Sequence, residues 1–464
     1  MRIALACWLL VGSLRAEEIL RAAVLSADGK TLIVATSAAL QWREPRSDKV
    51  IRSVARSGTG SLALSPDGRI LAAGERTIHL LDSASGKPLG KLFGHTAAVH
   101  SLAFLPGGER LVSTDEAGQL RLWDLKTQKA IRAATAHPRS AQASALSPDS
   151  GTLAVSTPQG VQLFEAATLQ RGLPLRPRGS DQPVTAVAFS PDGRTLAALY
   201  ADHCIRVWEL ATGEIRTARS ASRDLLHTLA FRPDGRTLLI GGERLVAWDL
   251  RADRVQPIGE RRDLVPRALF PLAGGLLVVT EQGHFHEPRL PSGPEFKALG
   301  VAEAWEALDE RDAERAYRGL WSLLHTREGV DHVVAQLRDV SAEIRARRQK
   351  IQQLIADLDH EDFPVREKAS AALAKLGPDV YEDLETALRV ELPLEQHRRI
   401  ERLLRGMKRP TNPLPSGLIR RLRGIEVLEY ANTPEAWAVL EKLATGDDPR
   451  LAAAAKSSLT RRKK

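Results

Sequence analysis

Apolar and polar residues alternate in short runs through the first 290 residues of the chain, and these runs return about every forty positions. Alternation with a period of two is typical of half-buried β-strands. One phrase recurs with each return, and its copies are LSADGKTL at 25–32, LSPDGRIL at 64–71, LPGGERL at 105–111, LSPDSGTL at 146–153, FSPDGRTL at 189–196, FRPDGRTL at 231–238 and a worn seventh, LFPLAGGLL, at 269–277.

Each copy of the phrase predicts a tight turn between two antiparallel strands, because proline presets φ and Asp-Gly favours chain reversal. In one unit, Val184–Phe189 precedes the turn and Thr195–Leu199 follows it. Most units add a third strand such as Gln119–Trp123 and a weaker fourth such as Pro88–Phe93. A single sheet of four short strands cannot bury both of its faces, whereas several packed radially can. Seven units therefore predict a seven-bladed β-propeller.

Tryptophan and aspartate end several of the predicted third strands. The pairs are Trp123-Asp124 and Trp248-Asp249, with Trp208-Glu209 as a near match, and Gly94-His95 precedes the third unit. In these features the chain resembles WD-repeat β-propellers over about residues 20–290.

The resemblance implies a hydrogen-bonded group of His, Ser or Thr, Asp and Trp within each blade. The third unit supplies His95, Ser113 and Trp123, with Ala117 at the expected aspartate position. The fifth unit has Asp202 and Trp208 but lacks the histidine, and the fourth keeps His137 without the tryptophan. The residues expected in this structural network are His95, Ser113, Trp123, Asp124, His137, Asp202, Trp208, Trp248 and Asp249.

The sequence leaves the closure of the ring open. The strand expected at Glu17–Leu25 opens the first unit, so no earlier strand is evident to complete the last blade. Closure by Phe296–Leu299, or a helical domain covering the junction, are the alternatives.

Beyond Glu287–Pro294 the apolar period changes from 2 to 3.6, which predicts helices. Thr433-Pro434 and Asp448-Pro449 are helix-start signals, and Asp362 is expected to cap a helix at its N-terminus. The segments 355–377 and 418–459 resemble HEAT-like repeats. The expected division is a signal peptide at 1–16, the propeller at 17–299, connecting helices at 300–350 and a HEAT-like domain at 351–464.

The N-terminus reads as an export signal. Met1-Arg2 is followed by an apolar stretch, Ile3–Val11, and by small residues that allow cleavage after Ser13 or Ala16. The stretch is short for a membrane span, so a retained anchor is the weaker alternative. The whole layout is similar to a group of bacterial WD-repeat proteins, and the sequence predicts a periplasmic or envelope-associated protein.

Few residues suggest chemistry. The chain has no nucleophile elbow, P-loop, Rossmann glycine pattern or HExxH motif. His284 and His286 could begin a metal site but lack an evident third ligand, and Cys204 reads as a small core residue. We therefore expect no catalytic, metal or cofactor site.

The net charge of +9 is not concentrated in one segment. Basic clusters at 345–350, 420–423 and 461–464 are mixed with acidic residues at helical spacing, which favours solvated helix faces over nucleic-acid binding. The sequence thus predicts a non-catalytic scaffold that binds other proteins. An enzyme at the propeller channel, lactonase- or lyase-like, and nucleic-acid binding through the basic tail are the alternatives; peripheral membrane contact and the oligomeric state stay open.

Overall fold

The computed structural model describes residues 19–462, apart from 27, 46, 48, 138–142, 178–181, 221–225, 227, 244, 252, 259–265, 273–274, 281–284, 287–297, 311 and 408–416. The chain divides into two compact units: residues 1–210 with 217–295, and residues 211–216 with 296–464. The proposed signal segment lies outside the described residues.

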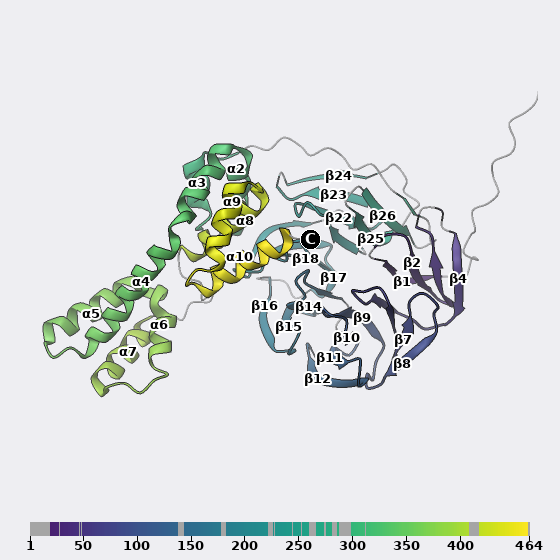
Figure 1. Cartoon of the computed structure of the whole chain (residues 1–464), viewed down its shortest axis with the longest axis horizontal. Coiled ribbons are helices and arrows are strands. Elements are labelled where there is room, and N and C mark those ends of the chain that lie inside the picture. Colours follow the sequence, from purple (N-terminus) through teal and green to yellow (C-terminus); the bar gives the residue numbers. More distant parts are fainter. Residues whose placement is uncertain are drawn as a thin grey trace, which may run out of the picture. The chain divides into compact units, whose positions relative to one another are not determined.

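The described residues of the first unit form seven antiparallel sheets (Figure 1). Six have four strands in sequence order, and the described part of the last has three. The first three sheets contain Leu20–Leu25 (β1), Leu32–Thr36 (β2), Ala39–Arg43 (β3) and Val50–Ala55 (β4); Ser61–Leu64 (β5), Ile70–Gly74 (β6), Ile78–Asp82 (β7) and Pro88–Leu92 (β8); and Val99–Phe104 (β9), Arg110–Asp115 (β10), Gln119–Asp124 (β11) and Lys129–Thr135 (β12).

The remaining four sheets follow the same order along the chain. They contain Ser144–Leu146 (β13), Thr152–Thr157 (β14), Gly160–Glu165 (β15) and Arg171–Leu175 (β16); Val184–Phe189 (β17), Thr195–Tyr200 (β18), Cys204–Glu209 (β19) and Glu214–Ser220 (β20); Thr228–Phe231 (β21), Thr237–Gly241 (β22), Leu245–Asp249 (β23) and Arg254–Pro257 (β24); and Pro266–Leu272 (β25), Gly275–Thr280 (β26) and Phe285–His286 (β27).

The recurring phrase forms the turn between the first and second strands of a sheet. In the second sheet Ser65 Oγ–H donates to Asp67 Oδ1 (2.6 Å), and the same carboxylate accepts from the Arg69 amide (3.0 Å). These bonds hold the pKa of Asp67 below its usual range, with the serine bond as the main cause. Gly68 follows with φ +72°, a conformation that favours glycine. The serine and aspartate of the phrase therefore stabilise the turn that glycine permits.

Neighbouring sheets pack face to face through apolar side chains. Ile33 and Trp42 of the first sheet meet Leu71 and Leu81 of the second, and similar clusters join the second to the third and the third to the fourth. The innermost strands β5 and β9, and β17 and β21, lie against each other, and Figure 1 shows the sheets arranged around a centre. The first unit is a β-propeller.

The first and last sheets pack directly on each other. Leu20 and Leu32 share one cluster with Leu277 and Val279 of the last sheet, and β1 lies beside β25. Among the described residues, side-chain packing closes the ring without a strand shared between the two sheets. Of the alternative closure segment, Phe296 and Lys297 lie outside the described residues.

The described part of the second unit contains ten α-helices. They are Val301–Ala307 (α1), Ala313–His325 (α2), Arg327–Arg338 (α3), Val340–Ala356 (α4), Phe363–Leu376 (α5), Tyr381–Ala387 (α6), Leu394–Gly406 (α7), Leu418–Ala431 (α8), Pro434–Ala444 (α9) and Pro449–Arg462 (α10), with short 3₁₀ turns at Asp357–Asp359 and Gly377–Val380. None of these helices is long and apolar enough to cross a membrane.

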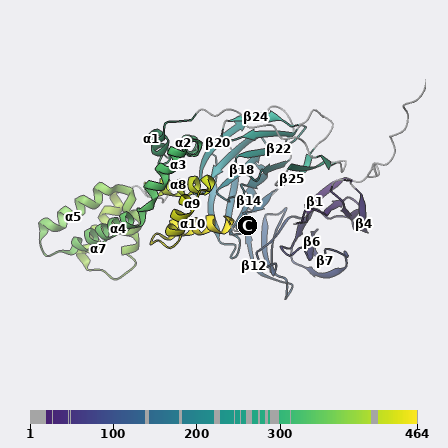
Figure 2. The same cartoon turned by 45° about the horizontal axis from the view of Figure 1, so that its top comes forward.

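Helices α1–α3 and α8–α10 form one group, although some eighty residues separate them in sequence. Helix α8 packs on α2 and α3, and α9 packs on α3 and α8 (Figure 2). Arg423 of α8 is buried and its Nη1 donates to the carbonyl oxygens of Leu308 (2.7 Å) and Glu310 (2.8 Å), just beyond α1. Those carbonyls follow the last turn of α1 and would otherwise need other donors.

Helices α4–α7 form a second group with its own core. Ile351, Leu358, Leu373, Leu384 and Ile400 are buried together in it. Helix α4 spans the expected boundary between 350 and 351, α2 and α3 pack on α8, and α3 also packs on α9. Helices that pack together, such as α3 and α8, are therefore not neighbours in the sequence.

Two helix starts illustrate what capping patterns can and cannot predict. Thr433 caps α9, since its side chain accepts from the Ala436 amide (3.2 Å), and Asp448 Oδ1 accepts from the Arg450 amide (2.9 Å) at the start of α10. Asp362 occupies the N-cap position of α5, but its side chain makes no capping hydrogen bond. The predicted helix start was correct there and the predicted cap was wrong.

Candidate functional site

The third sheet contains a buried chain of four polar side chains. His95 Nδ1–H donates to Asp115 Oδ2 (2.9 Å), and Ser113 Oγ–H donates to His95 Nε2 (2.6 Å). Trp123 Nε1–H in turn donates to Ser113 Oγ (2.7 Å), and Asp115 Oδ1 accepts from the Gln119 amide (2.9 Å). Every polar atom in this network thus has a partner, which is what burial requires.

The network fixes the protonation of its histidine. Burial lowers the pKa of His95, and the hydrogen bond and charge of Asp115 only partly oppose it. The neutral ring carries its proton on Nδ1, facing Asp115, and presents the Nε2 lone pair to Ser113. This tautomer satisfies both neighbours at once.

Serine, histidine and aspartate in this order resemble the catalytic triad of hydrolases. Here Ser113 is 1 % exposed and Asp115 is fully buried, so no substrate carbonyl can reach the hydroxyl. The indole N–H of Trp123 also occupies a lone pair of Ser113 Oγ. The geometry therefore serves packing of the sheet and not nucleophilic attack.

Asp115 is the residue that sequence analysis missed. The aspartate was expected at the position of Ala117, in the turn after β10, whereas the structure uses the last residue of β10. Ser113 and Asp115 are two apart on one strand, so their side chains share a face. That spacing was the signal in the sequence that could have identified Asp115.

The fifth sheet replaces this network with a stacked pair, Tyr200 and Arg206. By register, Ala198 and Tyr200 occupy the places of Ser113 and Asp115. The guanidinium of Arg206 lies 4.2 Å from the centre of the Tyr200 ring, and burial raises the pKa of Tyr200 to about 12.

Within the described part of the fifth sheet, Asp202 and Trp208, both expected in a blade network, are not hydrogen-bonded to each other. Asp202 is exposed, accepts from the Cys204 amide (2.9 Å) and lies near Arg206. The buried Trp208 Nε1 has no hydrogen-bond partner among the described residues.

The second sheet uses charges instead. Glu75, which takes the register position of Asp115, lies 3.4 Å from Arg56 Nη1 and accepts from Thr59 Oγ1 (3.4 Å). His79 also faces this carboxylate at 3.9 Å, and burial, followed by the charge of Arg56, lowers its pKa. The second and third sheets therefore place polar groups at the same register positions but use different residue types there.

The remaining predicted residues lie outside the four-residue network. Asp124 accepts from the Thr127 amide (2.8 Å) and Asp249 from the Arg251 amide (2.9 Å), so both stabilise the turn after the third strand. Trp248 Nε1–H donates to Asp253 Oδ1 (2.9 Å), a residue of that turn. His137 is half-buried at the end of the third sheet.

The outer strands of the first four sheets share a different feature, a β-bulge that leaves an aliphatic side chain exposed. In the first three sheets the residues skipped by the pairing register are Ile51 in β4, Leu89 in β8 and Ile131 in β12. In the fourth, Gly172 and Leu173 of β16 lie opposite a single residue. Ile51, Leu89, Ile131 and Leu173 are between 45 % and 61 % exposed.

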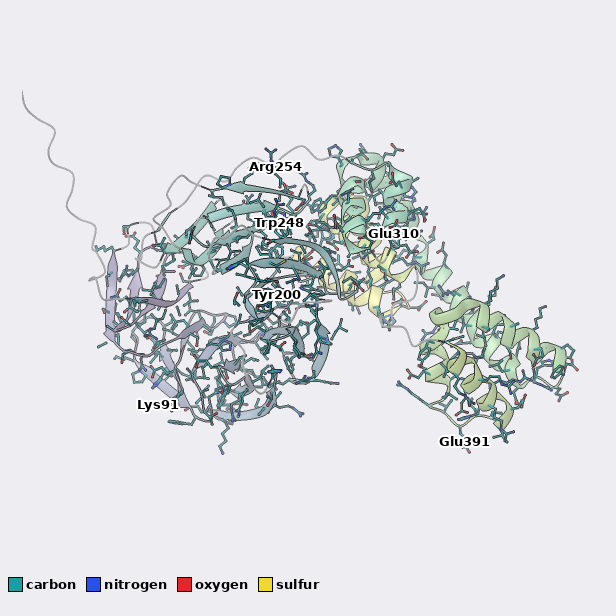
Figure 3. All side chains as sticks on the ribbon, turned by 180° about the vertical axis from the view of Figure 1, so that it is seen from behind. Lys91, Tyr200, Trp248, Arg254, Glu310 and Glu391 are labelled. Atoms are coloured by element: carbon teal, nitrogen blue, oxygen red, sulfur yellow. The ribbon has the colours of Figure 1, made fainter. Side chains whose placement is uncertain are left out.

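Cations accompany these side chains on the same strands, namely Arg52, Lys91, Lys129, Arg132 and Arg171, all of them exposed. None of β4, β8, β12 and β16 contains an acidic residue. Figure 1 shows the four strands at the periphery of the first unit, and Figure 3 labels Lys91 there. We call Ile51, Leu89, Ile131 and Leu173, with these five cations, the apolar–basic rim.

The remaining candidate residues, which are the possible metal ligands and Cys204, form no reactive site among the described residues. Among the described residues no group of three or more His, Cys, Asp or Glu side chains could hold a metal ion. His284 and the side chain of His286 are not described. Cys204 is half-buried, and burial raises the pKa of its thiol, which disfavours the reactive thiolate.

Comparison with known proteins addresses the repeats. The family model described as "WD domain, G-beta repeat" matches residues 86–124 and 173–209. The chain carries WD repeats. The first match covers β8, the second covers the end of β16, and each continues through three strands of the next sheet, so one WD repeat of the sequence spans two neighbouring sheets.

Relatives of this WD-repeat protein are similar over part of its length. Periodic tryptophan protein 2 of Arabidopsis thaliana is 29 % identical over 179 residues, which is 38 % of this chain and 20 % of the relative. The small ribosomal subunit protein RACK1 of Candida albicans is 30 % identical over 125 residues, 26 % and 39 % of the two chains. An uncharacterized WD repeat-containing protein of Synechocystis sp. is 27 % identical over 151 residues, 32 % and 43 %. The similarity thus spans less than half of each of these relatives.

Proposed function

We propose that this protein is a non-catalytic scaffold that binds other proteins through its propeller surface and its helical unit. One observation carries the proposal: the trio of side chains that most resembles a catalytic site, Ser113, His95 and Asp115, is buried and saturated by hydrogen bonds. The exposed features are instead apolar and charged side chains on rigid strands. Relatives whose names place them in assemblies, such as the small ribosomal subunit protein RACK1, support the same reading.

In this proposal each of the seven sheets is one blade, and the helical unit is HEAT-like. Seven sheets of similar strand order, with the first packed on the last, support seven blades. Consecutive helices that pack together, such as α9 and α10, with capping residues at their starts, support a helical repeat.

Affinity purification after cross-linking in cells tests the scaffold function. The tagged full chain should recover the same small set of proteins in repeated experiments. The recovered amounts should be proportional to the amount of folded tagged chain. The Ser113→Ala variant, assayed at a temperature where it is folded, should recover the same set, because Ser113 is not exposed. Recovery of no reproducible protein, or a turnover activity abolished by Ser113→Ala, would contradict the proposal.

We also propose that the protein is bacterial and is exported to the periplasm or envelope. The support is the basic start, apolar core and small-residue exit of residues 1–16. Expressed in a Gram-negative host, the chain should appear in the periplasmic fraction with a new N-terminus at Leu14 or Glu17. Leu9→Arg should keep it in the cytoplasm at full length. An unprocessed cytoplasmic chain without that substitution would refute export.

A further inference from the structure

We propose that the apolar–basic rim binds an acidic polypeptide segment that also carries apolar residues. This inference rests on the proposed scaffold function and specifies the surface and the chemistry of the partner. The rim repeats one arrangement in four successive sheets: an aliphatic side chain at a bulge, with a cation on the same strand. A partner that matches it needs carboxylates and apolar side chains in alternation.

The exposed aliphatic residues are the observation that a purely structural role does not explain. Outer strands are free edges, and natural sheets protect such edges with lysine and with bulges. That rule accounts for Lys91, Lys129 and the bulges themselves. It does not account for Ile51, Leu89 and Ile131, because a bulged residue could be polar at no cost to packing.

From the second sheet to the fourth, neighbouring parts of the rim touch each other. Gly90 of β8 lies against the side chain of Gln128, which precedes β12, and Arg171 of β16 donates to the carbonyl oxygen of Thr135 (2.7 Å) at the end of β12. Neighbouring outer strands therefore present their aliphatic and basic side chains side by side, which suits an extended segment that passes from sheet to sheet.

Charge complementarity identifies the partner. The four strands carry five exposed cations and no carboxylate. Such a surface attracts acidic groups and repels basic ones, and it increases the rate at which an acidic partner associates. The aliphatic side chains then add apolar burial that does not depend on salt.

A polypeptide fits this rim better than an anionic membrane does. The four strands follow the curved periphery of the propeller, so a flat bilayer could meet only neighbouring ones (Figure 1). The outer strands also have one unpaired edge each, and their free amide and carbonyl groups would be costly to bury in lipid. A polypeptide can follow the curve and satisfy those groups.

Binding of synthetic peptides to the full chain tests the inference. A fluorescein-labelled peptide of Glu-Ile-Glu-Gly repeats should bind saturably and more weakly as salt rises. Peptides with Lys for Glu, or with Ser for Ile, should bind at least about tenfold more weakly. Lack of saturable binding by the Glu-Ile peptide overturns the proposal.

Variants locate the binding. Leu89→Ser with Ile131→Ser, and separately Lys91→Glu with Arg132→Glu, should each weaken binding by about tenfold. Arg254→Glu is the matched control: it lies on β24, an outer strand whose register with β23 is regular, and Figure 3 labels it. Its effect should be under about twofold. All five residues are exposed, so circular dichroism should show unchanged folding.

The outcomes separate this inference from the scaffold function. If the rim variants bind the peptide as well as the unsubstituted chain, or if only anionic vesicles bind, or if the rim mediates self-association instead, the inference is wrong. The scaffold function still stands if cross-linked partners are recovered equally by those variants. If no partner is recovered at all, the scaffold function itself fails.

Discussion

At the scale of single residues, this propeller keeps a polar cluster at one place in the blade while changing its members. His95, Ser113, Asp115 and Trp123 use neutral hydrogen bonds beside one carboxylate, and the second sheet uses Arg56 and Glu75. In the third sheet every polar group of the cluster has a hydrogen-bond partner. The fifth sheet differs, because the buried indole N–H of Trp208 has no partner among the described residues.

Ser113→Ala tests how much the complete network contributes. The change leaves the Trp123 indole donor and the Nε2 acceptor of His95 without partners inside the sheet. We expect a loss of about 2–3 kcal/mol in the free energy of unfolding, measured by urea denaturation.

The control for Ser113→Ala is Ser47→Ala, an exposed serine in the loop between β3 and β4, which should change stability by less than about 0.5 kcal/mol. Equal effects of the two substitutions would show that the network contributes nothing to stability.

At the scale of elements, short-range patterns predicted strands and helices well and side-chain partners poorly. Val184–Phe189 and Pro434–Ala444 begin where alternation and the Thr-Pro signal place them, because turns and caps act over a few residues. Asp115 was missed because its partner lies twenty residues away and the choice between Asp115 and Ala117 depends on strand register. The packing of α8 on α2 and α3 has no local signal at all.

Two helix starts form a matched pair. Thr433→Ala removes a capping hydrogen bond and should cost about 1 kcal/mol. Asp362→Ala removes a residue at the same position whose side chain makes no such bond, so its cost should be clearly smaller. Thermal unfolding of both variants measures the difference. A larger loss for Asp362→Ala would show that capping bonds do not decide these helix starts.

Strand β9 and the segment before it make stability depend on pH. Burial lowers the pKa of His95, and it lowers that of His100 from 6.5 to about 4. Since the unfolded chain binds protons at these histidines more readily, stability is fully present above pH 6.5 and is lost as pH falls toward 4.

The temperature at the midpoint of thermal unfolding should therefore be lower at pH 4.5 than at pH 7. His100→Gln should reduce this dependence, whereas His325→Gln, an exposed residue at the end of α2, should leave it unchanged. A profile that is as steep in His100→Gln as in the unsubstituted chain would contradict this assignment.

At the scale of the whole molecule, each unit is closed by contacts between segments distant in sequence. In the helical unit, α8 and α9 cover α2 and α3, while α4–α7 keep a separate core. A linear array of repeats would tolerate removal of its last members, because each repeat contacts only its neighbours. This arrangement predicts the opposite.

A chain ending at residue 407 should lose more helical circular dichroism than the removed helices account for, because α1–α3 lose the surface they pack on. Arg423→Met in the full chain should show a milder form of the same effect, since the carbonyl oxygens of Leu308 and Glu310 lose their donor. A truncated chain that keeps the remaining helices intact would show that α1–α3 fold independently.

The meeting of the first and last sheets has a consequence for synthesis. Leu20 and Leu32 are covered by Leu277 and Val279 of the last sheet, so some 250 residues must be made before this face of the opening sheet is covered. During that interval this apolar face of the sheet is exposed to water and to other chains. A chaperone that binds exposed apolar β-strands could bind it there. A permuted gene that starts at the second sheet and places the first after the last should move this exposure from the first sheet to the second.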